Sequence, residues 1–142
     1  MEPCQAIRSL ADSYKRQFAD MRQSKRSYNR IDIWSTRFQV VGHHCEIWGW
    51  QGGNYNYVCN YVAPNHEVAN DTYEQARTTI SQCLGDSWEL TETPRQQGAG
   101  KQTLFKLAGF AAVVDLRLVE TRGISTPNWA VYLMVGDFND QL

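Results

Sequence analysis

Apolar positions near the start of the chain recur at alternating spacings of three and four residues. The stripe consists of Cys4, Ile7, Ala11, Tyr14, Phe18 and Met21. Such spacing places every member on one side of a helix, while polar residues take the other side. The pattern therefore predicts an amphipathic helix over residues 4–23.

A second stripe with the same period predicts a helix over residues 66–84. Its members are Tyr73, Ala76, Ile80, Cys83 and Leu84. Asn65 or Asn70 could cap the start of this helix, because an amide oxygen can accept from the free N–H groups of a first turn. Gly85 suits the other end, where a left-handed residue is common.

Between the helices, the period changes to two in a pair of aromatic-rich runs. These runs, 44–50 and 55–62, flank Gly52 and Gly53, which favour a tight turn. A three-residue loop over 51–53 would place Trp50 opposite Asn54 and Cys45 opposite Cys59. The sequence predicts a β-hairpin over residues 43–63, with Ile47 and Tyr57 on its buried face.

The remaining apolar residues predict further strands. Residues 31–41 have no clear period and indicate either an irregular covering segment or a short strand. Residues 87–136 read as an antiparallel meander with strands at 88–93, 103–107, 112–121 and 129–135. In the third of these, Asp115 and Arg117 alternate with apolar residues and are expected to face solvent, as are Glu89 and Glu92 elsewhere in the meander.

The order of predicted elements, α-β-β-α-β-β-β-β, favours a single α+β domain over residues 1–142. We expect two helices packed on one face of an antiparallel sheet, in two layers. The last strand could lie at a sheet edge, which leaves open whether the protein is a monomer or a homodimer formed through an edge strand. No run of about 18 apolar residues is present, so membrane insertion is not expected.

The four cysteines are even in number and contain no closely spaced CxxC pair, which favours disulfides over a metal site. Cys45 and Cys59 oppose each other in the predicted hairpin, and Cys4 and Cys83 stand at the outer ends of the two helices. The spacing leaves the other two pairings and reduced thiols as alternatives. Disulfides form in oxidising compartments, so we expect a periplasmic or secreted protein whose signal peptide was removed.

The common signatures of catalysis are missing from the sequence. There is no GxSxG, HExxH, GxGxxG or complete phosphate-loop motif, so we expect no catalytic residue, no cofactor and no enzymatic activity. His43 and His44 could coordinate a metal with Cys59 or His66. However, neighbouring residues of a strand point to opposite faces, so no metal site is expected.

The net charge of the chain and its distribution indicate which classes of partner the protein could bind. The formal net charge is −1, which provides no overall attraction for nucleic acid. Six basic residues nevertheless lie within residues 15–30: Lys15, Arg16, Arg22, Lys25, Arg26 and Arg30. They indicate either a solvated surface or a docking surface for an acidic protein or a phosphate group.

Aromatic and Asn residues concentrate in the hairpin and supply the candidate binding residues. These are Trp48, Trp50, Asn54, Tyr55 and Asn56. Trp and Tyr are enriched at binding hot spots, and Asn adds adaptable hydrogen bonds. The alternative is that these aromatic side chains only pack against the helices.

Several of these features together resemble small exported proteins of Gram-negative bacteria. The resemblance spans a helix opened by Cys4, a hairpin ending in Tyr57, Val58 and Cys59, a helix ending in Cys83 and Leu84 before Trp88, and a last strand from Trp129. It implies a periplasmic or secreted location and the pairing of Cys4 with Cys83 and of Cys45 with Cys59. It carries over no catalytic residue.

The sequence thus favours a non-enzymatic binding protein that docks a protein partner. By analogy of size and location, the partner would be a delivered toxin that this protein blocks as an immunity or inhibitor protein. A peptidoglycan- or glycan-binding module is the alternative, because exposed Trp and Tyr rings can stack on sugars. A third class, a cysteine or metal enzyme, would require a free thiol or a bound ion.

Overall fold

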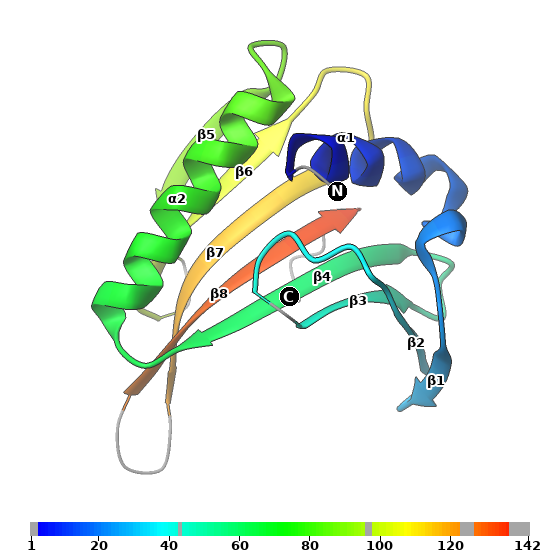
Figure 1. The fold of residues 1–142 in the computed structure, drawn as a ribbon, viewed down its shortest axis with the longest axis horizontal. Coiled ribbons are helices and arrows are strands. Elements are labelled where there is room, and N and C mark those ends of the chain that lie inside the picture. Colours follow the sequence, from blue (N-terminus) through cyan, green and yellow to red (C-terminus); the bar gives the residue numbers. More distant parts are fainter. Residues whose placement is uncertain (1–2, 43, 96–97, 123–126, 137–142) are drawn as a thin grey trace.

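The computed structural model describes residues 3–42, 44–95, 98–122 and 127–136. Within them lie two α-helices and one antiparallel sheet of eight strands in the order β1-β2-β3-β4-β8-β7-β6-β5 (Figure 1). The elements are α1 (Pro3–Ser13), β1 (Lys25–Tyr28), β2 (Ile31–Ser35), β3 (His44–Gly49), β4 (Tyr55–Ala63), α2 (His66–Leu84), β5 (Glu89–Pro94), β6 (Gly100–Lys106), β7 (Val113–Arg122) and β8 (Pro127–Gly136).

The predicted α+β class is confirmed, but the predicted order of elements is wrong. Four strands, not two, precede α2. For residues 31–41 the sequence allowed either an irregular segment or a short strand, and β2 is that short strand. Strand β1 was not predicted. All four residues of β1 are exposed, so this strand has no alternation of apolar and polar residues from which it could be recognised.

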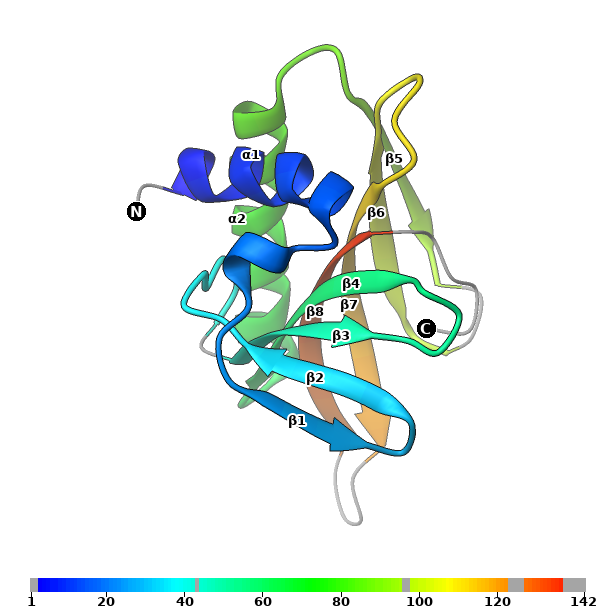
Figure 2. The same ribbon diagram turned by 90° about the vertical axis from the view of Figure 1, so that its right-hand side faces the viewer.

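The two halves of the chain have the same architecture although no sequence repeat relates them. Each half is a helix followed by a four-stranded meander, and the two meanders join through β4 and β8. Figure 2 shows β1 and β2 running across the view while β5 and β6 stand nearly upright, so the sheet is strongly twisted. The expected two flat layers are therefore only an approximation.

The first helix is shorter than predicted. It ends at Ser13 instead of residue 23 and is followed by two 3₁₀ turns, Tyr14–Arg16 and Ala19–Met21. Gln17 and Phe18 between them have positive φ angles of 59° and 57°. Two left-handed residues cost roughly 2–4 kcal/mol, but the bend buries Phe18 and Met21, which is worth roughly 3–6 kcal/mol. Burial therefore outweighs helix continuation.

Helix α2 spans His66–Leu84, as predicted. The Asn65 side chain accepts a hydrogen bond from the Val68 N–H at 2.9 Å, which identifies Asn65 rather than Asn70 as the cap. Gly85 ends the helix with φ of 87°, and its N–H donates to the Ser81 carbonyl at 3.1 Å. Local sequence signals are sufficient for this element.

The predicted meander is present, with one correction to its position. Strands β5 to β8 correspond to the four predicted strands, with ends shifted by one to three residues. Strand β8, however, lies in the middle of the sheet, where it pairs with both β4 and β7. It cannot be the edge of a homodimer, because the outermost strands are β1 and β5.

The sheet has an inner face that packs against both helices and an outer face on the opposite side. Ile47, Tyr57, Leu116 and Leu133 are fully buried on the inner face, where they form one core with residues of α1 and α2. Both expected disulfides are present: Cys4–Cys83 joins the two helices, and Cys45–Cys59 joins β3 to β4.

Candidate functional site

The register of the β3–β4 hairpin assigns each predicted binding residue to a face of the sheet. Cys45 pairs with Cys59, and the Trp50 N–H donates to the Asn54 carbonyl at 2.9 Å. Both pairings agree with the predicted three-residue loop. Trp48, Trp50 and Asn56 consequently lie on the outer face, and Tyr55 lies on the inner face.

The two outer-face tryptophans are held in fixed positions by hydrogen bonds from their indole N–H groups. Trp50 Nε1 donates to Asn56 Oδ1 at 2.9 Å, and Trp48 Nε1 donates to Glu46 Oε1 at 3.3 Å. Asn56 itself is buried, with 3% of its surface exposed. The indole rings contact each other edge to face, with centroids 5.8 Å apart and planes at 63°. Both rings are half-buried and leave part of their surface open to a partner.

Tyr55 has a structural role instead. Its ring lies 5.9 Å from that of Trp34, and the Arg22 guanidinium covers both rings at 4.6 Å and 4.4 Å from their centroids. Such cation–π contacts stabilise the stack by about 0.5–2 kcal/mol. The predicted binding residues are thus divided: Tyr55 packs at the inner face, Asn54 is exposed in the turn, and the other three lie on the outer face.

The structure adds three residues, Arg26, Tyr28 and Ile31, to the predicted aromatic binding residues on the outer face. Cross-strand pairing places Arg26 beside Ile33, Ile33 beside Trp48, and Tyr28 beside Ile31. Tyr28 is 67% exposed, and Arg26 forms an ion pair of 2.7 Å with Glu46. We refer to Arg26, Tyr28, Ile31, Trp48 and Trp50 as the outer-face patch.

A turn signal in the sequence could have revealed part of this patch. Asn29 and Arg30, between Tyr28 and Ile31, have positive φ angles of 49° and 67°. These angles are typical of a two-residue type I′ hairpin, in which Asn is favoured. Recognising Asn29 as a turn residue would have predicted strands on either side of it.

Further along the outer face, a polar cluster contradicts the expected exposure of Asp115. Asp115 is only 5% exposed and accepts from Arg117 Nη2 at 2.9 Å and from Gln102 Nε2 at 3.0 Å. Burial raises the pKa of this carboxyl, and the Arg117 guanidinium opposes that rise. The cluster is a hydrogen-bonded ion pair within the sheet rather than a solvated surface.

A second polar network attaches α2 to β5 and β6. The Tyr73 hydroxyl donates to Glu92 Oε2 at 2.9 Å and is hydrogen-bonded to the Thr103 hydroxyl. Glu92 is exposed, as expected, but it lies on the face of the sheet toward α2 and not on the outer face. Burial raises the pKa of Tyr73, which disfavours its phenolate at neutral pH and hence a role as a base. Glu74 on the same helix accepts from Lys101 Nζ at 2.6 Å.

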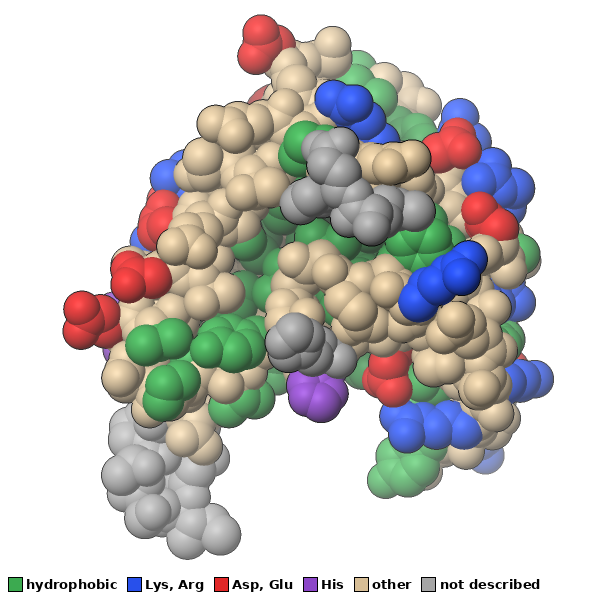
Figure 3. Space-filling model, viewed as in Figure 1, with side chains coloured by type: hydrophobic (Ala, Val, Ile, Leu, Met, Phe, Trp, Pro, Cys, Tyr) green, Lys and Arg blue, Asp and Glu red, His purple; other side chains and the backbone are tan. Residues whose placement is uncertain are grey.

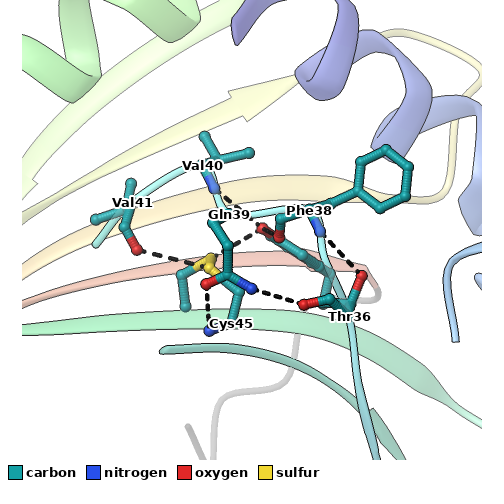
Figure 4. Close-up of a disulfide and its surroundings, with 8 residues drawn as sticks. Thr36, Phe38, Gln39, Val40, Val41 and Cys45 are labelled. Atoms are coloured by element: carbon teal, nitrogen blue, oxygen red, sulfur yellow. Dashed lines mark hydrogen bonds between the residues drawn. A yellow bond between two sulfur atoms is a disulfide. The ribbon is translucent and has the colours of Figure 1, made fainter. Parts of the chain in front are cut away.

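The disulfide of the hairpin lies beneath the segment that connects β2 to β3 (Figure 4). The buried Tyr57 hydroxyl donates to the Phe38 carbonyl at 2.5 Å and accepts from the Val40 N–H at 3.3 Å. Gln39 Oε1 accepts from the Cys45 N–H at 3.2 Å. Figure 4 shows this segment folded over the sulfur atoms. All four cysteines are in disulfides, so none is available as a thiol nucleophile.

On the helix side, a cleft of about 260 Å³ lies between α1, α2 and the same connecting segment. Figure 3 shows the hollow with hydrophobic side chains inside it. Its lining includes Ile7, Val41, Ala76 and Ile80, with Thr72 among its polar members, and contains no charged residue.

Within the described ranges, no group of three or more His, Cys, Asp or Glu is arranged to hold a metal ion. Of the histidines considered, His44 is exposed at the start of β3, His66 packs on Trp129 with centroids 4.3 Å apart, and His43 lies outside the described residues.

Comparison with known proteins identifies no matching family model, no related curated protein and no similar solved structure. In the part of the chain that the structure describes, no helix is long and apolar enough to cross a membrane.

Proposed function

We propose that this chain is a non-enzymatic, disulfide-stabilised binding protein of the periplasm or the extracellular space, which docks a protein partner on its outer-face patch. The observation that carries the proposal is the cross-strand register. It brings Tyr28 of β1, Ile31 of β2 and Trp48 of β3 onto one face of the sheet, where Trp50 follows Trp48 at the end of β3. Both described α-helices pack on the other face.

The composition of the patch supports a protein partner. Trp, Tyr and Arg are the residue types most enriched among binding hot spots, and the patch contains all three. The tryptophans are already held by Asn56 and Glu46, so little side-chain freedom would be lost on association. Tyr28 provides exposed aromatic area at the rim.

The two disulfides support the proposed compartment. Two disulfides in one small chain are typical of oxidising compartments and unusual in the cytosol. For the partner class we retain the expectation drawn from size and location, namely a delivered toxin that this protein blocks.

A glycan partner is less well supported by the geometry. Sugar rings in an extended chain stack best on aromatic faces that lie roughly parallel, whereas the two indole planes cross at 63°. One indole could still bind a single ring. Binding of purified peptidoglycan fragments by the parent protein, lost in Trp48→Ala and Trp50→Ala, would favour the glycan alternative over our proposal.

The proposal is tested by affinity capture from cell-envelope extracts and from competing cells that deliver toxins. Tyr28→Ala removes an exposed patch residue, and Val62→Ala removes an equally exposed apolar residue (60%) at the far end of the same face. Neither side chain belongs to the buried core, so both variants should fold. We expect Tyr28→Ala to weaken binding of the captured protein by at least about tenfold and Val62→Ala to leave it unchanged. Failure to capture any specific protein, or equal effects of the two variants, would overturn the proposal.

A further inference from the structure

Strand β1 is an unprotected edge of the sheet beside the outer-face patch. Among the described strands, it is first in the sheet order and pairs only with β2 (Figures 1 and 2). All four of its residues, Lys25–Tyr28, are exposed. An edge strand of this kind presents backbone N–H and C=O groups to which another strand can bind.

The turn after β1 determines which backbone groups are free. In a two-residue hairpin loop, the flanking residues form a hydrogen-bonded pair, and such pairs then alternate along the strands. The loop is Asn29–Arg30, so Tyr28 and Arg26 bond to β2. Lys25 and Ser27 direct their N–H and C=O groups away from the sheet.

Charge indicates what kind of strand this edge accepts. Residues 22–46 contain five basic and two acidic side chains, a formal charge of +3 in a chain whose total is −1. The ion pairs Lys25–Asp32 at 3.6 Å and Arg26–Glu46 at 2.7 Å leave Arg30 in the turn as a further cation. A positive edge attracts an acidic segment and repels a second β1 edge.

The opposite edge of the sheet has the reverse character. Strand β5 is also fully exposed, but residues 86–94 contain Asp86, Glu89 and Glu92 and no basic residue. An acidic strand would be repelled there. The two edges thus differ in charge, and only β1 suits an acidic partner.

We infer that β1 is a strand-addition site for an acidic, extended segment of the protein partner, which pairs with the free backbone groups of Lys25 and Ser27. Carboxylates on one side of that segment face Arg26 and those on its other side face Lys25, with Arg30 in the adjoining turn. The inference rests on the proposed protein-binding function and adds its mode of recognition. Backbone pairing supplies affinity, and the basic side chains select acidic sequences.

The test is an NMR titration of the full-length, isotope-labelled protein with a defined peptide. The probe is the capped heptapeptide Thr-Glu-Val-Glu-Thr-Glu-Val, and its control has Lys in place of each Glu. We expect amide shifts confined to β1, β2 and the adjoining turn, weakening as salt is raised, and no shifts with the lysine peptide. No shift at millimolar acidic peptide, shifts centred on β5, or the same shifts with inorganic phosphate would overturn the inference.

A pair of variants at one position isolates the backbone contribution. Ser27→Pro removes the outward N–H, and Ser27→Ala removes only the hydroxyl, which donates to Asp32 Oδ1 at 2.8 Å. Proline is tolerated at sheet edges. We expect Ser27→Pro to weaken peptide binding by up to about tenfold relative to Ser27→Ala. Equal binding by the two variants would contradict strand addition.

The failure of this inference can be told apart from failure of the proposed function. If a captured partner depends on Tyr28 yet binds Ser27→Pro as well as Ser27→Ala, the patch functions without strand addition. If the peptide binds at β1 but no partner protein is captured, the proposed function fails while the edge chemistry stands.

Discussion

At the scale of single residues, Tyr57 connects the core to the segment that covers the hairpin disulfide. Its side chain is fully buried, and burial raises the pKa of its hydroxyl, which therefore remains a hydrogen-bond donor. The hydroxyl donates to Phe38 and accepts from Val40, and it lies 3.0 Å from Cys59 Sγ. One oxygen thus satisfies two backbone groups of a segment that belongs to neither a helix nor a strand.

Removing this oxygen should cost more than a typical surface change. We expect Tyr57→Phe to lower the free energy of unfolding by about 1–3 kcal/mol, because a part-buried carbonyl and a part-buried N–H lose their partner. Urea unfolding followed by tryptophan fluorescence measures the change. Tyr28→Phe removes the hydroxyl of an exposed side chain and should stay within about 0.5 kcal/mol. Equal losses in both variants would show that the contacts of the Tyr57 hydroxyl contribute nothing.

At the scale of elements, α2 is attached to the sheet by an ion pair as well as by its apolar stripe. The Lys101 ammonium on β6 lies 2.6 Å from the Glu74 carboxylate on α2. Arg77, which is on α2 itself, forms a second ion pair with Glu74 at 3.0 Å. The hydrogen bond from Lys101 is the main cause of the lowered pKa of Glu74, and Arg77 contributes to it. The folded state thus favours the ionised carboxylate.

This lowered pKa makes the contribution of Glu74 depend on pH. A carboxyl whose pKa is lower in the folded state stabilises the fold above its unfolded pKa, and that contribution is lost as pH falls through the folded pKa. The side chain is 35% exposed, so we expect Glu74→Gln to cost at most about 1 kcal/mol at neutral pH. The cost should vanish in acid.

Urea unfolding at neutral and acidic pH measures this difference. Asp86→Asn, at an exposed position in the loop after α2, is the control and should show no such trend. A cost of Glu74→Gln that is the same at both pH values would mean that the ion pair does not stabilise the attachment of α2.

At the scale of the whole molecule, two disulfides act on very different lengths of chain. Cys4–Cys83 spans 79 residues and joins the helices of the two halves, whereas Cys45–Cys59 spans 14 residues within one hairpin. In the chain-entropy model, the longer loop restricts the unfolded chain more. The model gives about 4.5 kcal/mol for Cys4–Cys83 and about 3 kcal/mol for Cys45–Cys59.

Replacing each pair by alanine should therefore destabilise the protein unequally. We expect the Cys4→Ala/Cys83→Ala variant to lose more unfolding free energy than the Cys45→Ala/Cys59→Ala variant, as measured by chemical unfolding without reductant. Intact mass under denaturing conditions, before and after reduction, confirms one remaining disulfide in each variant. A smaller loss for the long-range pair would show that the loop-closure argument does not dominate here.

The edges of the sheet also bear on the state of the whole molecule. Like charges would meet if two β1 edges or two β5 edges paired, which disfavours symmetric dimers through either edge. From the sequence, a homodimer formed through an edge strand remained possible, with the last strand, β8, as the candidate edge. The structure assigns the edges to β1 and β5.

Elements with local signals could be recognised from the amino-acid sequence alone. Helix α2 is encoded by a periodic stripe, a capping Asn65 and a terminal Gly85, and the hairpin register follows from two glycines and the alternation around them. These features depend on contacts between residues close in the chain, so the pairing of Cys45 with Cys59 could be predicted from spacing. The residues on the outer side of that hairpin could be predicted for the same reason.

Which elements lie side by side depends on contacts between residues far apart in the chain. The left-handed bend at Phe18, the strand at 25–28 and the central position of β8 depend on partners distant in sequence. Three of the five residues in the outer-face patch were absent from the predicted binding residues for this reason, because Tyr28 joins Trp48 and Trp50 only when β1 and β2 pair with β3. Periodicity reports which side of an element is buried, but the choice of neighbour depends on the packing of the whole chain.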